Sequence, residues 1–326
     1  MGRYLKIIWF SFFGLSALFS AVFLWGYFQF KAPGPLKNET LIIIERGSGI
    51  HSISKILQKA GILKRPHVFS IIARVLNIDK KLKAGEYAFA KGVSYKGILD
   101  LLQSGKTVIR RITIAEGLRT ETVLAILDQT EGLQGIVSSP PKEGSLLPET
   151  YHFSFGDSRE KIIQRMIDAR QRLLRDLWQE RELNLPFKSP EEAVILASIV
   201  EKETSIPIER SRVAAVFINR MKKGMRLQSD PTVVYSLTKG VIKLGRRLTR
   251  ADLRTPSAYN TYLIQGLPPG PIANPGRASL YAVLHPAKST ELYFVADGKG
   301  GHMFAKSLKE HNLNVLKWRR IQKERK

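Results

Sequence analysis

A pair of carboxylates that could transfer protons lies in the stretch Glu201-Lys202-Glu203. Upstream of it, Ser189 is a suitable helix N-cap and Pro190 suits the first helical position. Glu192 then completes the pattern of a capping box, in which a side chain three residues on returns to the start of the helix. The sequence therefore predicts a helix over residues 189–204 that carries both carboxylates near its end.

The two carboxylates face different ways on that helix. At 100° per residue, Glu203 falls about 20° from Leu196 and inside the apolar arc that Ile199 continues. Lys202 falls on the polar side, and Glu201 lies about 160° around the helix from Glu203. One carboxylate of the pair is therefore expected to point at the interior.

A carboxyl group held among apolar side chains has its charged form disfavoured, so its pKa rises. A raised pKa is what a general acid needs in order to protonate a glycosidic oxygen near neutral pH. The alternative is a glutamate at a helix end that pairs with an arginine or accepts backbone hydrogen bonds. The position of Glu203 on a wheel leaves both interpretations open, since the helix could end before it.

The chain has 326 residues, no cysteine and a formal net charge of +24. The absence of cysteine excludes disulfides, zinc–thiolate sites and thiol nucleophiles. Lys and Arg are spread along the chain, and such a positive field attracts anionic surfaces such as nucleic acid, acidic lipid or a cell wall. Charge by itself does not choose among these partners.

A membrane anchor is predicted at the N-terminus. Residues 7–30 contain no Asp, Glu, Lys, Arg or His, and as a helix of 24 residues they would span ~30 Å of hydrocarbon. Arg3 and Lys6 precede the run, which favours a cytoplasmic N-terminus. A cleaved signal peptide is the alternative, but residues 30–35 form a poor cleavage site. The sequence after Lys31 is expected outside the cytoplasm, which argues against nucleic acid as a partner.

The exported part is expected to be α+β and to hold two domains after the anchor and linker of residues 1–37. Residues 38–108 alternate strands at 41–44 and 84–89 with helices near 53–60, 69–76 and 98–102, the last ended by Gly105. Residues 109–326 mix helices at 162–178, 189–204 and 207–223 with short strands at 112–114 and 292–296. A loop is expected at 129–141, a turn at 297–301 and a basic tail at 317–326.

A series of motifs in this order resembles one family. They are KAGEY at 83–87, EGSLLPETY at 143–151, ASIVEKET at 197–204, VFINRM at 216–221, GMRLQSDPTVVY at 224–235, YNTY at 259–262, GLPPGPI at 266–272 and FVADGKGGH at 294–302. Together with the single N-terminal anchor they resemble the YceG-like endolytic murein transglycosylases, the MltG family, over nearly the whole chain. The stretch 145–149 departs from the family, in which an aromatic residue and Asp are more usual.

The resemblance implies a lytic transglycosylase that acts on peptidoglycan glycan strands. The family's catalytic glutamate matches Glu203, the residue that the helical wheel selects independently. The family's N-terminal module is LysM-like, which suits residues 38–108. Glu203 would protonate the oxygen between MurNAc and GlcNAc and then accept the proton of the MurNAc C6 hydroxyl, which closes a 1,6-anhydro ring. Neither a metal nor another cofactor is implied.

The resemblance also implies a cellular location. This is the inner membrane, with the catalytic domain outside the cytoplasm and beside the glycan-polymerising synthases, whose nascent strands it would shorten.

Polar and aromatic residues within these motifs are candidates to bind sugar, because amides and tyrosines can hydrogen-bond hydroxyl and N-acetyl groups. The candidates are Asn219, Gln228, Asp230, Tyr235, Tyr259, Asn260 and Tyr262. Asp230 before Pro231 could instead be a helix N-cap, and Asn219 with Arg220 could simply tie helices together. The tyrosines could be core residues with a solvated hydroxyl.

Three functions are compatible with the sequence. An enzyme that cleaves glycan strands is favoured. A non-catalytic wall-binding scaffold would not require the intact Glu203, and a cationic nucleic-acid binder is supported by charge alone and opposed by the membrane segment. Digestion of purified glycan strands, with mass detection of anhydro ends, distinguishes the three.

Overall fold

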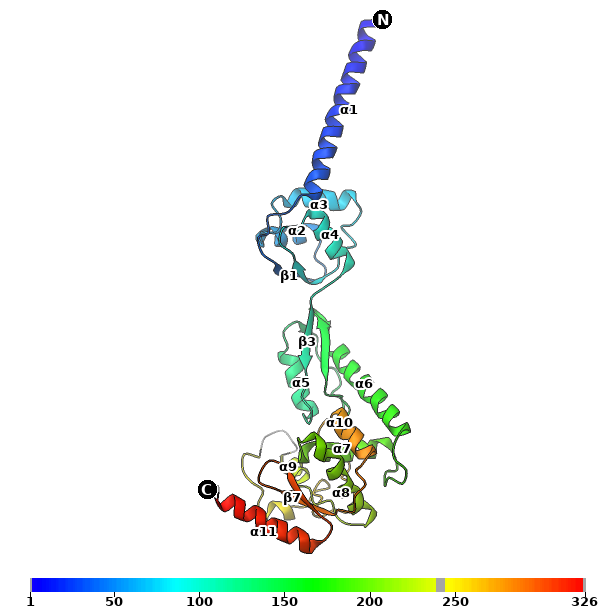
Figure 1. Cartoon of the computed structure of the whole chain (residues 1–326). Helices are drawn as coiled ribbons and strands as arrows, with labels where there is room; N and C mark the ends of the chain where they lie inside the picture. The colour runs from blue at the N-terminus through cyan, green and yellow to red at the C-terminus, as the bar shows by residue number, and fades with distance from the viewer. Residues whose placement is uncertain (1, 239–243, 325–326) are drawn as a thin grey trace. The chain divides into compact units, whose positions relative to one another are not determined.

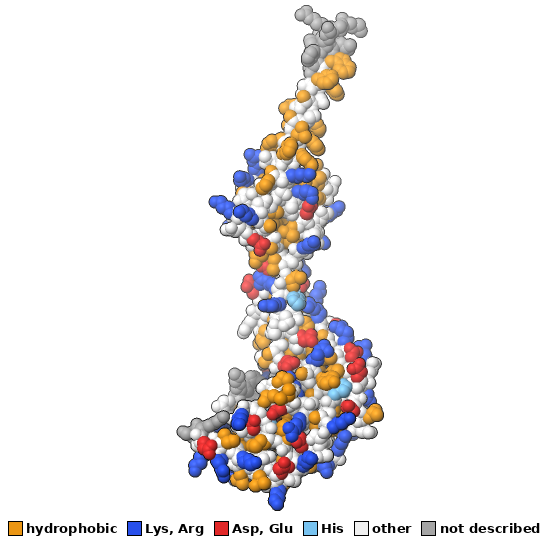
Figure 2. Space-filling model, in the orientation of Figure 1, with side chains coloured by type: hydrophobic (Ala, Val, Ile, Leu, Met, Phe, Trp, Pro, Cys, Tyr) orange, Lys and Arg blue, Asp and Glu red, His pale blue; other side chains and the backbone are white. Residues whose placement is uncertain are grey.

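The computed structural model describes residues 2–238 and 244–324, which form two compact units (Figure 1). The first unit comprises Met1–Arg110 and Phe153–Gly156, and the second comprises Arg111–His152 and Asp157–Lys326. Helices and strands are both present in each, as the α+β prediction requires. Lys and Arg side chains are scattered over the visible face of the molecule rather than gathered in one block (Figure 2).

The chain begins with a long apolar helix, α1 (Gly2–Lys31). Its stretch Phe12–Lys31 is long and apolar enough to cross a membrane, and none of its residues is fully buried, although Phe30 packs against the core of the module that follows. Hydrophobic side chains along α1 are exposed (Figure 2). This helix coincides with the predicted anchor, and a single-pass membrane anchor is compatible with it.

The remainder of the first unit is a two-stranded antiparallel sheet with three helices. Strand β1 (Thr40–Ile44) pairs with β2 (Gly85–Phe89), and the helices are α2 (Ile50–Lys59), α3 (Pro66–Val75) and α4 (Tyr95–Ser104). Ser94 caps α4 by accepting the Gly97 N–H at 3.1 Å, and Gly105 ends it in a left-handed conformation with φ 73°. The strands, the helices and the role of Gly105 are confirmed. The LysM-like character of the module stays a prediction.

The second unit is mainly helical. Strands β3 (Ile109–Thr113) and β5 (Thr150–Ser154), which each span the boundary between the two units, form one two-stranded sheet, and β4 (Leu133–Gln134) and β6 (Asp157–Ser158) form a parallel pair within the second unit. The helices are α5 (Thr120–Gln129), α6 (Arg159–Gln179), α7 (Pro190–Glu203), α8 (Arg210–Lys222), α9 (Asp230–Thr238), α10 (Arg277–Leu284) and α11 (Leu308–Glu324). Two short 3₁₀ turns occupy Pro207–Glu209 and Asp252–Arg254, and β7 (Tyr293–Ala296) forms an antiparallel hairpin with β8 (His302–Ala305).

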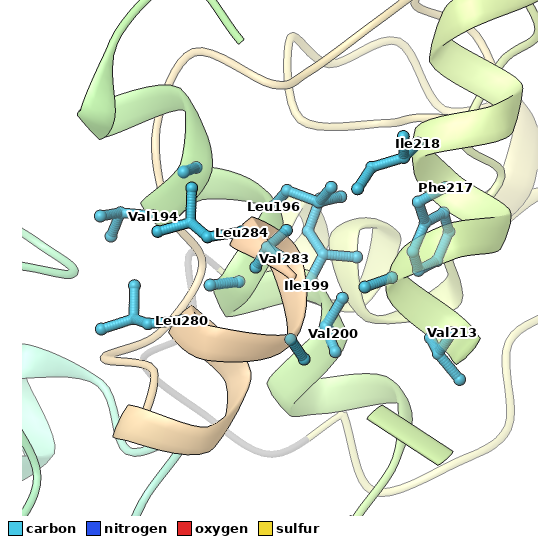
Figure 3. Close-up of a cluster of buried hydrophobic side chains, with 14 of the residues drawn as sticks. Val194, Leu196, Ile199, Val200, Val213, Phe217, Ile218, Leu280, Val283 and Leu284 are labelled. Carbon is cyan, nitrogen blue, oxygen red and sulfur yellow. The ribbon is translucent and has the colours of Figure 1, made fainter. Parts of the chain in front are cut away.

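Helix α7 lies at the centre of the second unit's core, packed against α8 and α10 (Figure 3). Leu196, Ile199 and Val200 are fully buried, and each such side chain contributes about 1.5–3 kcal/mol. Burial extends around most of the helix, since Ser198 is also inaccessible and accepts the Ile272 N–H at 3.0 Å. The core therefore holds α7 firmly on several sides.

The structure bears on three predictions about segments outside the expected helices. The expected basic tail at 317–326 is helical as far as residue 324, where it forms the end of α11, and its Lys and Arg side chains are exposed; residues 325 and 326 lie outside the described part. The expected loop at 129–141 contains the short strand β4. The turn at 297–301 is confirmed, since Asp297 accepts the N–H groups of Lys299 and Gly301 at 2.6 and 3.0 Å between β7 and β8.

Candidate active site

Glu203 is the last residue of α7, so the helix does reach it. At the other end Ser189 Oγ accepts the Glu192 N–H at 3.4 Å, as predicted. The Glu192 carboxylate, however, accepts the Lys188 N–H at 2.6 Å, so the capping box is not closed on Ser189 itself. Thr204 follows in an extended conformation and ends the helix.

The carboxyl group of Glu203 lies among groups that favour its protonated form. Burial raises its pKa to about 7, and the nearby negative charge of Asp230 acts in the same direction. A hydrogen bond from Ser229 and the positive charge of Arg220 oppose the rise without cancelling it. The residue is only partly buried as a whole, so a ligand can still approach it. The raised pKa is the direction expected from the helical wheel.

Ser229 supplies the direct contact to Glu203, by donating its hydroxyl to Oε1 at 2.5 Å. Ser229 is itself buried, and its N–H donates to Thr261 Oγ1 at 2.9 Å. Thr261 and Thr232 are buried and share a hydrogen bond of 2.8 Å between their hydroxyls. This chain of hydroxyl groups fixes the serine that orients the glutamate.

Sequence reasoning missed Ser229, Thr232 and Thr261. The signal was present in the motif at 224–235, where the serine stands between the two candidates Gln228 and Asp230. Gln228 has φ 51°, an uncommon conformation for a residue other than glycine, and its exposed side chain precedes the buried serine. Backbone conformations of this kind concentrate at functional sites.

Arg220 braces the same loop from α8. Its guanidinium is buried and donates from Nε to Leu292 O at 2.6 Å and from Nη1 to Leu227 O at 2.5 Å. The second bond holds the chain two residues before Ser229. Arg220 therefore ties α8 to two segments outside the helices, rather than to another helix, and its charge also reaches Glu203.

Glu201 has a different environment from Glu203. Its side chain is buried and accepts from Arg210 at 3.4 Å and from the Gly276 N–H at 3.0 Å. Arg210 also pairs with Glu116 at 3.3 Å. Gly276 admits this cluster because a Cβ there would lie 1.9 Å from Glu116 Oε1. Glu201 therefore joins α7 to its surroundings as part of a charge cluster.

Two pairs among the predicted sugar-binding residues are brought together. Tyr262 donates its hydroxyl to Asp230 Oδ1 at 2.6 Å, and burial followed by this bond raises the pKa of Tyr262. The rings of Tyr235 and Tyr259 lie 4.8 Å apart between centroids. Asp230 begins α9 directly after Ser229, so the first pair lies beside the glutamate.

The remaining amide candidates make other contacts. Asn260 is fully buried and donates to the backbone oxygens of Leu253 and Thr255 at 3.1 and 2.9 Å. Asn219 donates to the backbone oxygens of Ser289 and Glu291 at 2.8 and 3.0 Å, which favours the alternative that it ties elements together. Neither amide contacts Glu203 in this structure.

The arrangement can transfer a proton at one carboxyl group. Oε1 of Glu203 is held by Ser229, so Oε2 is the oxygen on which an exchangeable proton would reside. A cavity of about 820 Å³ opens beside Asp230 and Tyr235, although Glu203 does not line it. Asp230 lines the cavity and its charge reaches Glu203, so a protonated carboxyl group lies near a ligand-sized cavity, which suits acid–base chemistry on a bound chain.

The sequence is similar to that of known proteins from one family. The sequence profile of the YceG-like family matches residues 42–317. An endolytic murein transglycosylase of Bacillus subtilis (strain 168) is 34% identical over 308 residues, which cover 85% of this chain and 84% of that protein. An endolytic murein transglycosylase of Streptococcus pneumoniae (strain D39 / NCTC 7466) is 30% identical over 328 residues, which cover 86% of this chain and 58% of that protein.

A solved structure is also similar. The crystal structure of a YceG-like protein from Listeria monocytogenes aligns with a TM-score of 0.50 and 33% sequence identity, over 85% of this chain and 99% of that one.

Proposed function

The chain belongs to the YceG-like family, and from that premise we propose that it is an endolytic murein transglycosylase in which Glu203 is the catalytic acid and base. Similarity to the transglycosylases of Bacillus and Streptococcus supports the reaction class and the peptidoglycan substrate. The observation that carries the residue assignment is the buried carboxyl group of Glu203, with a pKa of about 7 and one hydroxyl partner.

The reaction divides into two proton transfers at the same carboxyl group. Protonated Glu203 donates its proton to the oxygen between MurNAc C1 and GlcNAc, so that the C1–O bond breaks and GlcNAc leaves with a hydroxyl. The resulting carboxylate accepts the proton of the MurNAc C6 hydroxyl, whose oxygen bonds to C1 and closes the 1,6-anhydro ring. Because the nucleophile belongs to the same sugar, the step benefits from proximity, and Glu203 ends protonated again.

The structure suggests how neighbouring residues assist. Ser229 orients Glu203 through Oε1 and stabilises the carboxylate that forms between the two transfers. Asp230, held by Tyr262, places a negative charge near the carboxyl group, which keeps the proton available at neutral pH. Arg220 limits that effect, so that the carboxylate remains attainable.

Purified glycan strands provide the test of this function. Digestion with wild-type protein should release fragments with 1,6-anhydroMurNAc ends, detected by mass spectrometry. Simple hydrolysis would leave reducing ends that are heavier by one water, and that product would contradict the transglycosylase mechanism.

The location of the enzyme is a second part of the proposal. Helix α1 would anchor it once in the inner membrane, with both units after Lys31 outside the cytoplasm, supported by the apolar stretch Phe12–Lys31 and by Arg3 and Lys6 before it. Protease added to intact spheroplasts should degrade the catalytic unit. Recovery of a mature protein that begins near Ala32 would instead indicate a cleaved signal peptide.

The module at 38–108 is proposed to be LysM-like and to help hold glycan, supported by its own buried core around Leu57, Phe69 and Tyr87. Its deletion from the anchored protein should weaken binding to intact sacculi. Unchanged binding and unchanged activity would show that the module serves another purpose. The synthases that polymerise glycan are proposed partners, to be tested by co-purification from solubilised membranes.

A further inference from the structure

The cavity beside Asp230 has a strongly cationic lining. It lies within the second unit, measures about 820 Å³ and is bounded by α9, the segment 244–248 and α11. Four of the described residues that line it are cationic, namely Arg119, Lys202, Arg246 and Arg247. Asp230 is the acidic residue among them, and Tyr235 and Trp318 give the wall aromatic surface.

Two of the four cations have carboxylate partners within the protein. Arg246 binds both oxygens of Asp252, at 2.5 and 2.9 Å. Arg119 lies 3.7 Å from a Glu143 oxygen and within 5.8 Å of the Tyr235 ring. These two arginines shape the cavity but are largely compensated in charge.

The other two cations have no carboxylate partner among the described residues. Lys202 Nζ donates to the backbone oxygen of Gly117 at 3.3 Å, which fixes its position but leaves its charge uncompensated. Arg247 is exposed, and its backbone oxygen accepts from Arg246 while its guanidinium forms no ion pair within the described residues. A cavity with two uncompensated cations favours an anionic ligand.

The position of these cations relates the cavity to the reaction. Lys202 precedes Glu203 on α7, and Asp230 follows Ser229, which donates to Glu203. A group bound in the cavity would therefore lie next to the residues that act on the glycosidic bond. The sugars of a glycan strand other than MurNAc are neutral, and the carboxylates of murein belong to the peptide stem and, where that stem is removed, to the lactyl group.

We propose that this cavity binds a carboxylate of the stem peptide on a MurNAc residue near the cleaved bond, with Lys202 and Arg247 as its cationic partners. The inference rests on the proposed function and adds a preference to it: strands that carry their stems are favoured over stripped strands. The volume is in the range of ordinary ligand sites, and Trp318 and Tyr235 offer surface to the apolar side chains of the peptide.

Two matched strands test the preference, one carrying its stems and one stripped by an amidase, which exposes the lactyl carboxylate. Arg247→Gln should lower kcat/KM on stem-bearing strands about tenfold, the size of one charge-assisted hydrogen bond, and change kcat/KM on stripped strands less than about twofold. Lys222→Gln removes an exposed cation on α8 away from the cavity and should alter neither. Equal losses on both strands, or no loss on either, would overturn the proposal.

Binding separates this proposal from the proposed function. In a Glu203→Gln background, titration calorimetry with a stem-bearing tetrasaccharide and with its stripped counterpart should show tighter binding of the first, and adding Arg247→Gln should abolish the difference. If wild type cleaves nothing but the difference in binding is present, the proposed reaction fails and the carboxylate site stands. If wild type cleaves normally and the two ligands bind equally, the site fails and the reaction stands.

Discussion

Glu201 and Glu203 lie on opposite sides of the last turn of α7 and have opposite electrostatic environments. Glu201 meets a guanidinium and a backbone N–H, so its charge is compensated. Glu203 meets one hydroxyl group in a setting that raises its pKa to about 7. A compensated carboxylate holds the structure together, whereas an uncompensated one keeps a proton that it can give away. Both residues are glutamates on the same helix. Their partners, which come from distant segments of the chain, decide whether each is structural or catalytic.

The largest expected difference between the two is in activity. Glu203→Gln keeps shape but cannot cycle a proton, so anhydromuropeptide release should fall by ~10²–10⁴ or more. Glu201→Gln, assayed below its melting temperature, should lose much less, within about tenfold of wild type, because Glu201 does not face the reacting bond. Release by purified variants from the same glycan preparation measures both. If Glu201→Gln is inactive and Glu203→Gln works, the comparison is reversed and the assignment is wrong.

The second difference is in how stability depends on pH. The folded protein holds the Glu203 proton up to about pH 7, while the unfolded chain releases it near the ordinary value of 4.5. The free energy of unfolding should therefore fall as pH rises through this window and stay level above it, as far as this group is concerned. Glu203→Gln has no titrating group at this position, so it should not show this decrease in the free energy of unfolding.

The measurement for this prediction is denaturant unfolding of wild type and Glu203→Gln at a series of pH values. The variant should gain on wild type by about 1–3 kcal/mol between pH 4.5 and 8, given ~1.4 kcal/mol per unit of pKa shift and some remaining contact with solvent. A constant difference across that range would show that the carboxyl group is solvated like an ordinary glutamate.

Glu201→Gln is expected to lower the free energy of unfolding at neutral pH. The amide can still accept one hydrogen bond, and Arg210 keeps Glu116, so the loss should be about 1–2 kcal/mol. Glu191→Gln is the matched control on α7, because the Glu191 side chain is 65% exposed and its pair with Arg170 should contribute less than about 0.5 kcal/mol. If the two variants unfold at the same urea concentration, the cluster of Glu201, Arg210 and Glu116 does not stabilise the fold.

The orientation of Glu203 could be predicted from the sequence, but the partners of Glu201 could not. The cap at Ser189 and the apolar spacing along 193–200 were enough to place Glu203 on the inward side of a helix. They could not show that Arg210, Glu116 and Gly276 meet at Glu201, because those partners come from three separate segments. The loss of stability expected for Glu201→Gln therefore rests on these contacts and could not be predicted from the sequence.

Other differences have the same physical origin. Ser229 reaches Glu203 only through a turn in which Gln228 has positive φ, and no periodic pattern reports such a turn. The stretch from Lys317 was predicted only as a basic tail, whereas as far as residue 324 it is the end of α11, a helix whose His311 stacks on Tyr293 at 5.2 Å between ring centroids. Long-range contacts of this kind override local composition, whereas caps and helical spacing are local and were predicted well.

The smallest expected effect concerns the hydroxyl that distinguishes the Glu203 side. Ser229→Ala removes a donor that stabilises the carboxylate, so the pKa of Glu203 should rise above its present value of about 7. Because the reaction begins with protonated Glu203, activity falls as pH rises through this pKa, and the descending limb of the pH–rate profile should move to higher pH. The rate at its optimum should drop about tenfold, as one hydrogen bond to a charged group is lost. Ser236→Ala, on α9 with its hydroxyl bonded to Val233 O, is the control and should leave the limb in place. A limb that stays put or moves to lower pH in Ser229→Ala would mean that Ser229 does not set the protonation of Glu203, and the contrast between the two glutamates would then need another cause.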